Sequence, residues 1–172
     1  MTKNKKGFTI IEVVLVLAIA GLIFLMVFIA LPALQRSQRN TRRRQDMSRI
    51  LAQFTEYQSN NAGKMPDSST INDFVNRYLI GSGTQGNSLG ADCESDQFCD
   101  PDGTAYYIEV KGERTDSNKT WNANFPNDHK IGYFNDAKCS GTEGEAGEGS
   151  GERDIAIFYV LEGGAVYCGD NQ

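Results

Sequence analysis

The sequence predicts an α+β fold in which one long N-terminal helix packs on a small antiparallel β-sheet. Residues 8–34 contain 23 apolar residues out of 27, and an amphipathic helical pattern continues directly after them. From residue 105 onwards, short segments rich in β-branched and aromatic residues alternate with glycine-rich turns, which is typical of strands. The first half of the helix is expected to span a membrane, and the second half is expected to cover the sheet.

Charge is distributed unevenly along the 172 residues. Residues 1–45 carry a net charge of +7 and residues 46–172 carry −12, which together give −5. A chain of this length has room for one domain with a core. The acidic C-terminal part argues against nucleic-acid binding through that domain, because phosphate binding needs clustered cations. The separation of a basic, apolar N-terminal part from an acidic C-terminal part also argues against a simple soluble enzyme.

The first half of the helix is long enough to cross a bilayer. No residue from Val13 to Leu34 is charged, and 22 residues of helix span about 33 Å against a hydrocarbon core of about 30 Å. A cleaved secretory signal would have a shorter apolar region and a small-residue cleavage site, whereas arginine-rich sequence follows here. A membrane-resident helix is therefore predicted.

Glu12 lies just inside the apolar segment. A charge at the middle of a bilayer costs about 2.5–3.5 kcal/mol on insertion scales, so an intramembrane acid is a candidate functional residue. The alternative is that Glu12 lies near the interface, where its side chain reaches water at small cost. The position alone leaves both interpretations open.

The segment Lys5–Leu15, with the sequence KKGFTIIEVVL, resembles the class III signal of type IV pilins and related pseudopilins. Its elements are a short basic leader, Gly7, Phe8, an apolar stretch, and Glu12 five residues after the glycine. The resemblance covers about the first 30 residues directly. It implies a pilin-like fold in which the long helix forms the spine of the subunit.

The resemblance also implies a processing route. A membrane prepilin peptidase would cleave between Gly7 and Phe8, the new Phe8 amine would be N-methylated, and the mature chain would carry a charge of −8. Glu12 would pair with the Phe8 amine of a neighbouring subunit during assembly, a pairing that serves register more than stability. Pro32 would mark a site of local helix melting during assembly, or only a kink where the helix leaves the membrane.

A run of arginines follows the apolar segment, and three interpretations of it are open. The arginines form a solvated helix surface near the membrane, or they face acidic neighbours in an assembled filament, or they bind DNA or anionic lipid. The positive-inside rule alone would keep the C-terminal part in the cytoplasm, but the leader motif and the cysteines favour the opposite orientation. The run comprises Arg36, Arg39, Arg42, Arg43 and Arg44.

The helix is expected to continue past the membrane and to end near residue 60, with Gly63 as the residue that ends it. Apolar residues at steps of three and four form a stripe that needs a partner downstream. The stripe consists of Met47, Ile50, Leu51, Phe54 and Tyr57.

A second helix is predicted over residues 70–79, with Ser68, Ser69 and Thr70 as candidate caps. A loop follows at 81–103. Strands are expected at 105–110, 130–134, 154–161 and 165–168, and the last two are expected to form a hairpin across residues 162–164. Residues 140–152, nearly all Gly, Glu, Ser and Thr, predict a mobile surface loop.

Four cysteines in an exported acidic domain indicate two disulfides. Three pairings are possible, and we favour Cys93–Cys99 and Cys139–Cys168. Zinc binding and free thiols are the alternatives, although the absence of a C-x-x-C pair in the sequence argues against zinc.

Asp96, Asp100 and Asp102, which precede Gly103, are weak candidates for a calcium loop. Their spacing differs from that of the EF-hand, so an acidic solvated turn is the favoured interpretation. We expect no metal and no cofactor.

Catalytic signals are weak in this sequence. His129 is the only histidine and lies in a polar turn, no motif marks a nucleophile, and no phosphate-binding glycine motif is present. We therefore do not expect an enzyme. The aromatic residues Trp121, Tyr106, Tyr107 and Tyr133 would line a surface adhesion site or pack in the core, and the core is favoured.

The resemblance implies a structural subunit of a type IV pilus that serves surface adhesion and twitching motility. The expected regions are a leader peptide at 1–7, a transmembrane and polymerisation helix at 8–34, its amphipathic continuation at 35–62 and an extracytoplasmic globular head at 63–172. The precursor would be a single-pass protein of the inner membrane and the product an extracellular filament. Expected partners are further copies of the chain, the prepilin peptidase, an assembly platform and its ATPase. Alternatives are a pseudopilin of a type II secretion-like or DNA-uptake system and, less in keeping with the sequence, a membrane-tethered enzyme.

Overall fold

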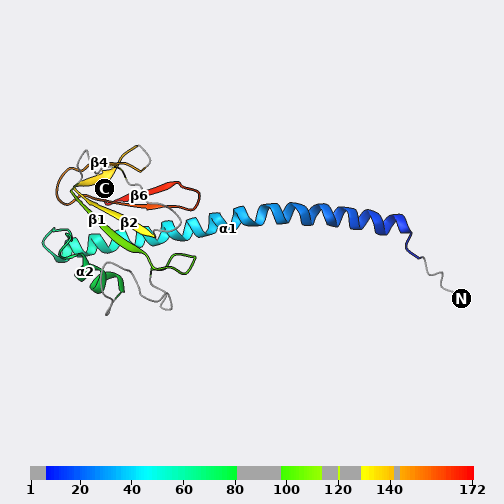
Figure 1. Ribbon diagram of the computed structural model, residues 1–172, viewed down its shortest axis with the longest axis horizontal. Coiled ribbons are helices and arrows are strands. Elements are labelled where there is room, and N and C mark those ends of the chain that lie inside the picture. The colour runs from blue at the N-terminus through cyan, green and yellow to red at the C-terminus, as the bar shows by residue number, and fades with distance from the viewer. Residues whose placement is uncertain (1–6, 81–97, 114–119, 121–128, 142–143) are drawn as a thin grey trace. The chain divides into compact units, whose positions relative to one another are not determined.

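The computed structural model describes residues 7–80, 98–113, 120, 129–141 and 144–172 (Figure 1). The chain forms two compact units, one up to Gln38 and one from Arg39 to Gln172. The helical elements are α1 (Ile10–Asn60), α2 (Ile71–Phe74) and a π-helix, η1 (Val75–Ile80). The strands are β1 (Tyr107–Glu113), β2 (Lys130–Asn135), β3 (Ala137–Cys139), β4 (Ala146–Glu148), β5 (Ile155–Val160) and β6 (Val166–Asp170).

The predicted long helix is confirmed, and its end has a clear local cause. Ala62 and Gly63 both have positive φ angles, of 55° and 82°, which the α-helix does not allow. The Gly63 amide donates a hydrogen bond of 2.9 Å to the carbonyl of Gln58 and closes the last turn. Gly63 therefore ends α1 as predicted.

The second half of α1 packs on one face of the sheet. Met47, Ile50 and Phe54 are fully buried, and Leu51 and Tyr57 are partly buried, so the predicted stripe is confirmed. Phe54 lies at the centre of an aromatic stack. Its ring centroid is 4.2 Å from that of Phe74 and 4.6 Å from that of Tyr133.

The main sheet has the strand order β1-β2-β5-β6. Strand β5 pairs antiparallel with β2 and β6, and the predicted hairpin across 162–164 is present. The α+β fold class is confirmed, but strand β1 pairs parallel to β2, so the predicted antiparallel pairing is wrong for this one strand. The connection over residues 114–129 is long enough for the chain to return before β2 begins, which a parallel pair requires.

A second small sheet is formed by β3 and β4, which pair antiparallel. The expectation of a mobile loop over residues 140–152 is therefore wrong for β4. Ala137 and Ala146 are buried against Phe134 and Phe158 on the face of the main sheet that points away from α1. Both faces of β5 are covered, which explains why all six of its residues are buried.

The predicted helix over 70–79 is present, but it changes from α to π geometry at Val75. Its cap also differs from the prediction, because Thr70 makes no side-chain cap hydrogen bond. Asp67 instead accepts hydrogen bonds from the amides and hydroxyls of Ser69 and Thr70. These bonds, those of Ser69 first, lower the pKa of Asp67 to about 2.

Candidate functional site

The expected cleavage site lies in non-helical chain. Residues 7–9 have no regular secondary structure, and α1 begins at Ile10. The Phe8 side chain is 90% exposed. Exposed backbone outside regular secondary structure is where proteolytic cleavage concentrates, and the Gly7–Phe8 bond lies in such a segment.

Thr9 and Glu12 form a capping box at the start of α1. The Thr9 amide and hydroxyl donate to Glu12 Oε2 over 2.8 and 2.7 Å, and the Glu12 amide donates to Thr9 Oγ1 over 3.4 Å. Glu12 is a candidate from the sequence, whereas Thr9 is a residue that only the structure adds. The signal that would have found it is Thr-x-x-Glu immediately before an apolar run.

The membrane-length part of α1 is apolar on every side. This part is long and apolar enough to cross a membrane. Its large apolar side chains are exposed, because no other described part of the chain covers them. Such a surface needs lipid or other protein around it. Pro32 lies inside the helix. Exposed members are Val13, Val14, Leu15, Val16, Leu17, Ile19, Leu22, Ile23, Phe24, Leu25, Met26, Val27, Phe28, Ile29, Leu31 and Leu34.

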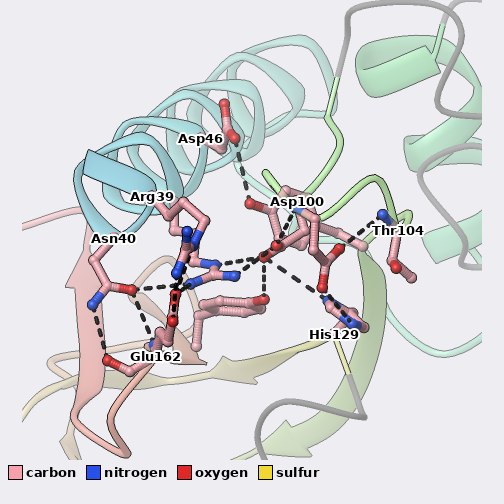
Figure 2. A network of polar contacts seen from close by, with 11 residues as sticks. Arg39, Asn40, Asp46, Asp100, Thr104, His129 and Glu162 are labelled. Atoms are coloured by element: carbon pink, nitrogen blue, oxygen red, sulfur yellow. Dashed lines mark hydrogen bonds and ion pairs between the residues drawn. The ribbon is translucent and has the colours of Figure 1, made fainter. Parts of the chain in front are cut away.

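In the second unit, α1 carries a buried ion pair (Figure 2). Arg43 is 2% exposed, and its Nε and Nη2 atoms donate to Asp100 Oδ2 and Oδ1 over 2.6 and 2.7 Å. The Tyr159 hydroxyl donates to Asp100 Oδ2 over 2.8 Å. This two-point contact joins α1, the loop before β1 and strand β5.

A second contact lies one turn earlier on α1. Arg39 donates to both Glu162 oxygens over 2.8 and 2.6 Å, and Asn40 exchanges two hydrogen bonds of 3.0 Å with the Glu162 backbone. The hydrogen bond from Arg39 lowers the pKa of Glu162 to about 2. The turn between β5 and β6 is thereby fixed to the helix.

These contacts correct the interpretation of the arginine run. Arg39 and Arg43 pair with acids of their own chain, an arrangement that the three sequence-based interpretations did not include. Arg42 and Arg44 are exposed. The sequence could not reveal the difference, because Arg43 and Asp100 are 57 residues apart.

Asp46 and Asp100 are both buried, but their surroundings differ. Burial raises the pKa of Asp46, because its contacts are long: 3.4 Å from the Tyr106 hydroxyl and 3.4 Å from Arg49. Burial also disfavours the Asp100 carboxylate, but Arg43, the Asp102 amide and Tyr159 outweigh it and lower the pKa of Asp100. Relative to water, the fold thus disfavours the anionic form of Asp46 and favours that of Asp100.

Asp100, Asp102 and His129 bring ligand atoms within 4.8 Å of one another. Both Asp100 oxygens already accept two hydrogen bonds each, from Arg43, Tyr159 and the Asp102 amide. A cation would have to displace one of these donors, so Asp100 fits the role of counter-ion to Arg43 better than that of a calcium ligand. Asp96 lies outside the described residues.

A disulfide joins Cys139 on β3 to Cys168 on β6, the pairing that the sequence favoured. Cys99 is also disulfide-bonded, while its expected partner Cys93 lies outside the described residues. Tyr106 and Tyr133 are fully buried and belong to the core. Tyr107 is 40% exposed, and Trp121 is not among the described residues.

Residues 2–28 match a family model described as the prokaryotic N-terminal methylation motif. The comparisons with curated proteins and with solved structures gave no match. The matched segment contains the Gly7–Phe8 bond and the capping box, and it ends within the apolar part of α1. This motif, on a chain whose long helix packs on a small β-sheet, supports membership of the type IV pilin and pseudopilin family.

Proposed function

We propose that the chain is a structural subunit of a type IV pilus, made as a membrane-anchored precursor and polymerised through residues 8–34. The observation that carries the proposal is an apolar helix, exposed on all sides, directly behind a methylation motif. Such a helix is stable in lipid before assembly and in a bundle of like helices afterwards. The motif also favours a structural role over an enzymatic one.

Cleavage after Gly7 would add water across the Gly7–Phe8 bond and leave a new amine on Phe8, which is then methylated. In an apolar bundle, the Glu12 carboxylate needs a partner, and the Phe8 amine of a neighbouring copy supplies one. Removing either partner would leave the other charge buried and unpaired. The pair therefore selects one register between helices that would otherwise slide along apolar surfaces.

The second unit would form the extracytoplasmic head of the subunit. Its acidic residues and the loops around the sheet would determine what the filament contacts in adhesion and twitching motility. The prepilin peptidase would process the precursor, and an assembly platform would extract it from the membrane. A separate ATPase would supply the energy, because the sequence has no phosphate-binding glycine motif.

The test is mass spectrometry of the mature protein together with electron microscopy of the cell surface. We expect an N-terminus at methylated Phe8 and long filaments built mainly of this chain. Glu12→Ala should abolish the filaments, whereas Glu56→Ala, which changes an exposed acid on the second half of α1, should leave them intact.

Two results would contradict the proposal in different ways. Correct processing with only short polymers confined to the cell envelope would identify a pseudopilin instead. An N-terminus other than Phe8 would contradict the processing route itself.

A further inference from the structure

A polar pocket lies where three connecting segments of the second unit meet: the one after α1, the β2–β3 turn and the β4–β5 turn. Its volume is about 360 Å³, and a neighbouring pocket of about 580 Å³ extends from it along residues 150–154. The smaller pocket therefore has room for a ligand beside side chains that take no part in the ion pairs of Arg39 and Arg43. It is lined by Gly63, Lys64, Met65, Asn135, Asp136 and Glu152.

Two side-chain oxygens of this pocket's residues are buried without a hydrogen-bond partner. They are Oδ1 of Asn135 and Oδ1 of Asp136, and no described residue donates to either. Buried polar atoms are nearly always hydrogen-bonded in folded proteins, so an unpaired acceptor indicates a missing partner such as water, an ion or a ligand. Two acceptors on adjacent residues, in the same pocket as the Glu152 carboxylate, fit a group with several N–H donors.

The backbone holds Asp136 in this position. Its φ angle of 49° turns the chain from β2 into β3, in a left-handed conformation that aspartate tolerates better than most residues. Its carbonyl accepts a hydrogen bond of 3.1 Å from the Gly149 amide, and a Cβ atom at Gly149 would lie 2.7 Å from Asp136 Oδ1. The missing side chain of Gly149 thus makes room for the carboxylate. The fold positions this acceptor before any ligand binds.

The charges at the pocket favour an organic cation over a metal ion. Two acids, Asp136 and Glu152, line it together with one base, Lys64. Among the described residues, the acidic and histidine side chains that converge closely enough for a metal are instead those around Asp100. A guanidinium group carries five N–H donors in one plane, whereas an ammonium group carries three, and guanidinium is the more weakly hydrated of the two. It therefore satisfies more acceptors and loses less hydration on entering.

We propose that this pocket binds a guanidinium group, with Asp136 and Glu152 as the acids and Asn135 Oδ1 as a neutral acceptor. The inference goes beyond the proposed function and does not depend on filament formation. The guanidinium belongs to a free small molecule or to a second copy of the chain, on which Arg42 and Arg44 are exposed. Both sources present the same chemistry to the pocket.

Methylguanidinium is the probe for the site. In full-length protein held in detergent micelles, the amide resonances of Lys64, Asn135 and Asp136 should shift and saturate, with a Kd of roughly 1–10 mM for so small a group. Tetramethylammonium, which has the same charge but no N–H donor, should bind at least about ten-fold more weakly. Asp136→Asn and Glu152→Gln should each weaken binding by about five-fold or more. Glu148→Gln, at an exposed acid of β4 outside the pocket, is the control and should change nothing.

Three outcomes would overturn the inference. Shifts that do not saturate, or that persist unchanged in Asp136→Asn and Glu152→Gln, would show that water satisfies these oxygens. Equal binding of the two probes would show that only charge, and no hydrogen bond, attracts the cation. Saturation of the same amides by Ca²⁺ but not by methylguanidinium would identify a metal site.

A concentration series without the probe separates the two sources of the guanidinium. With a second copy as the source, the same amide resonances shift as the protein concentration rises, and Arg42→Gln/Arg44→Gln abolishes that shift. Resonances that ignore protein concentration but saturate with methylguanidinium identify a free small molecule as the ligand. Failure of the probe to bind a protein that still forms filaments would overturn this inference alone and leave the proposed function standing.

Discussion

Arg43 and Asp100 form a two-point ion pair in which the side chains are 2% and 0% exposed, respectively. The pair links α1 to the loop before β1, and Tyr159 extends it to β5. A buried pair of this kind adds little net stability over an apolar pair, but the loss of one partner leaves an uncompensated charge in the interior. The contact therefore favours one position of α1 relative to the loop before β1 and to β5.

Arg43→Met is expected to lower the free energy of unfolding by about 3–5 kcal/mol, because Asp100 then remains buried without its counter-ion. The double variant Arg43→Met/Asp100→Leu should recover most of that loss. Denaturant unfolding of the full-length chain in micelles measures both. Arg42→Met is the matched control on the exposed side of the helix and should change stability by less than about 0.5 kcal/mol. Equal losses at the two arginines would contradict the assignment.

The pH dependence of stability should separate Asp46 from Asp100. The pKa of Asp100 is lowered on folding, so its contribution is fully present above about pH 4, the unfolded value, and is lost as the pH falls through the folded pKa. The pKa of Asp46 is raised on folding, so its ionisation destabilises the protein at neutral pH, and this penalty disappears as the pH falls.

Asparagine substitutions measure these opposite signs. Asp46→Asn should raise stability at pH 7, with a gain that vanishes as the pH falls below about 4, where the carboxyl is protonated in both the folded and the unfolded state. Asp100→Asn should lower stability at pH 7 and flatten the loss of stability in acid. Unfolding titrations between pH 3 and pH 8 compare the two variants. A destabilising Asp46→Asn at pH 7 would show that this carboxylate is better solvated or better paired than the structure indicates.

The disulfide between Cys139 and Cys168 closes a loop with a sequence separation of 29 residues. The loop-entropy relation gives a stabilisation of about 3–4 kcal/mol for a loop of this length. Cys139→Ser/Cys168→Ser should lose about that amount in thermal or denaturant unfolding. Treatment of the unchanged protein with a reductant should lower stability further, because Cys99 is also in a disulfide. A double variant as stable as the unchanged protein would rule out this contribution.

Two glycines of the turn between β4 and β5 offer a matched pair. A Cβ atom at Gly149 would lie 2.6 Å from the carbonyl carbon of Asp136, whereas one at Gly151 would meet nothing within 4 Å. Gly149→Ala should lower the free energy of unfolding by about 1–3 kcal/mol, because the backbone has to shift, and Gly151→Ala should be nearly neutral. The melting temperatures of the two variants, measured by thermal unfolding, test this difference. Similar melting temperatures would mean that the β3–β4 sheet adjusts without cost.

Local patterns were sufficient for the long helix and the last hairpin. The stripe through Met47, Ile50 and Phe54 has the helical period, and Gly163 and Gly164 have the positive φ angles, 107° and 91°, that a tight turn needs. The capping box of Thr9 and Glu12 is equally local and could have been predicted. The continuous apolar run of β5 could also have indicated that a second layer covers the sheet.

Pairing between residues far apart in the sequence cannot be predicted from such local patterns. Parallel pairing of β1 with β2 depends on the path of the chain between them, and no local pattern encodes it. The sequence favours an acidic solvated turn for Asp100, because acids usually face water, yet Asp100 is the buried partner of an arginine 57 residues away. A single sequence shows the charges of Arg43 and Asp100 but not the distance between them.

After the expected cleavage, only two residues, Phe8 and Thr9, precede the start of α1 at Ile10. Two residues reach at most about 7 Å, and Glu12 lies about 3 Å along the helix from Ile10. With a glutamate side chain of about 5 Å, the proposed pairing can form only between helices offset along their axes by no more than about 15 Å. The short overhang would therefore limit the axial stagger of neighbouring subunits and, through it, the pitch of any filament that this chain builds.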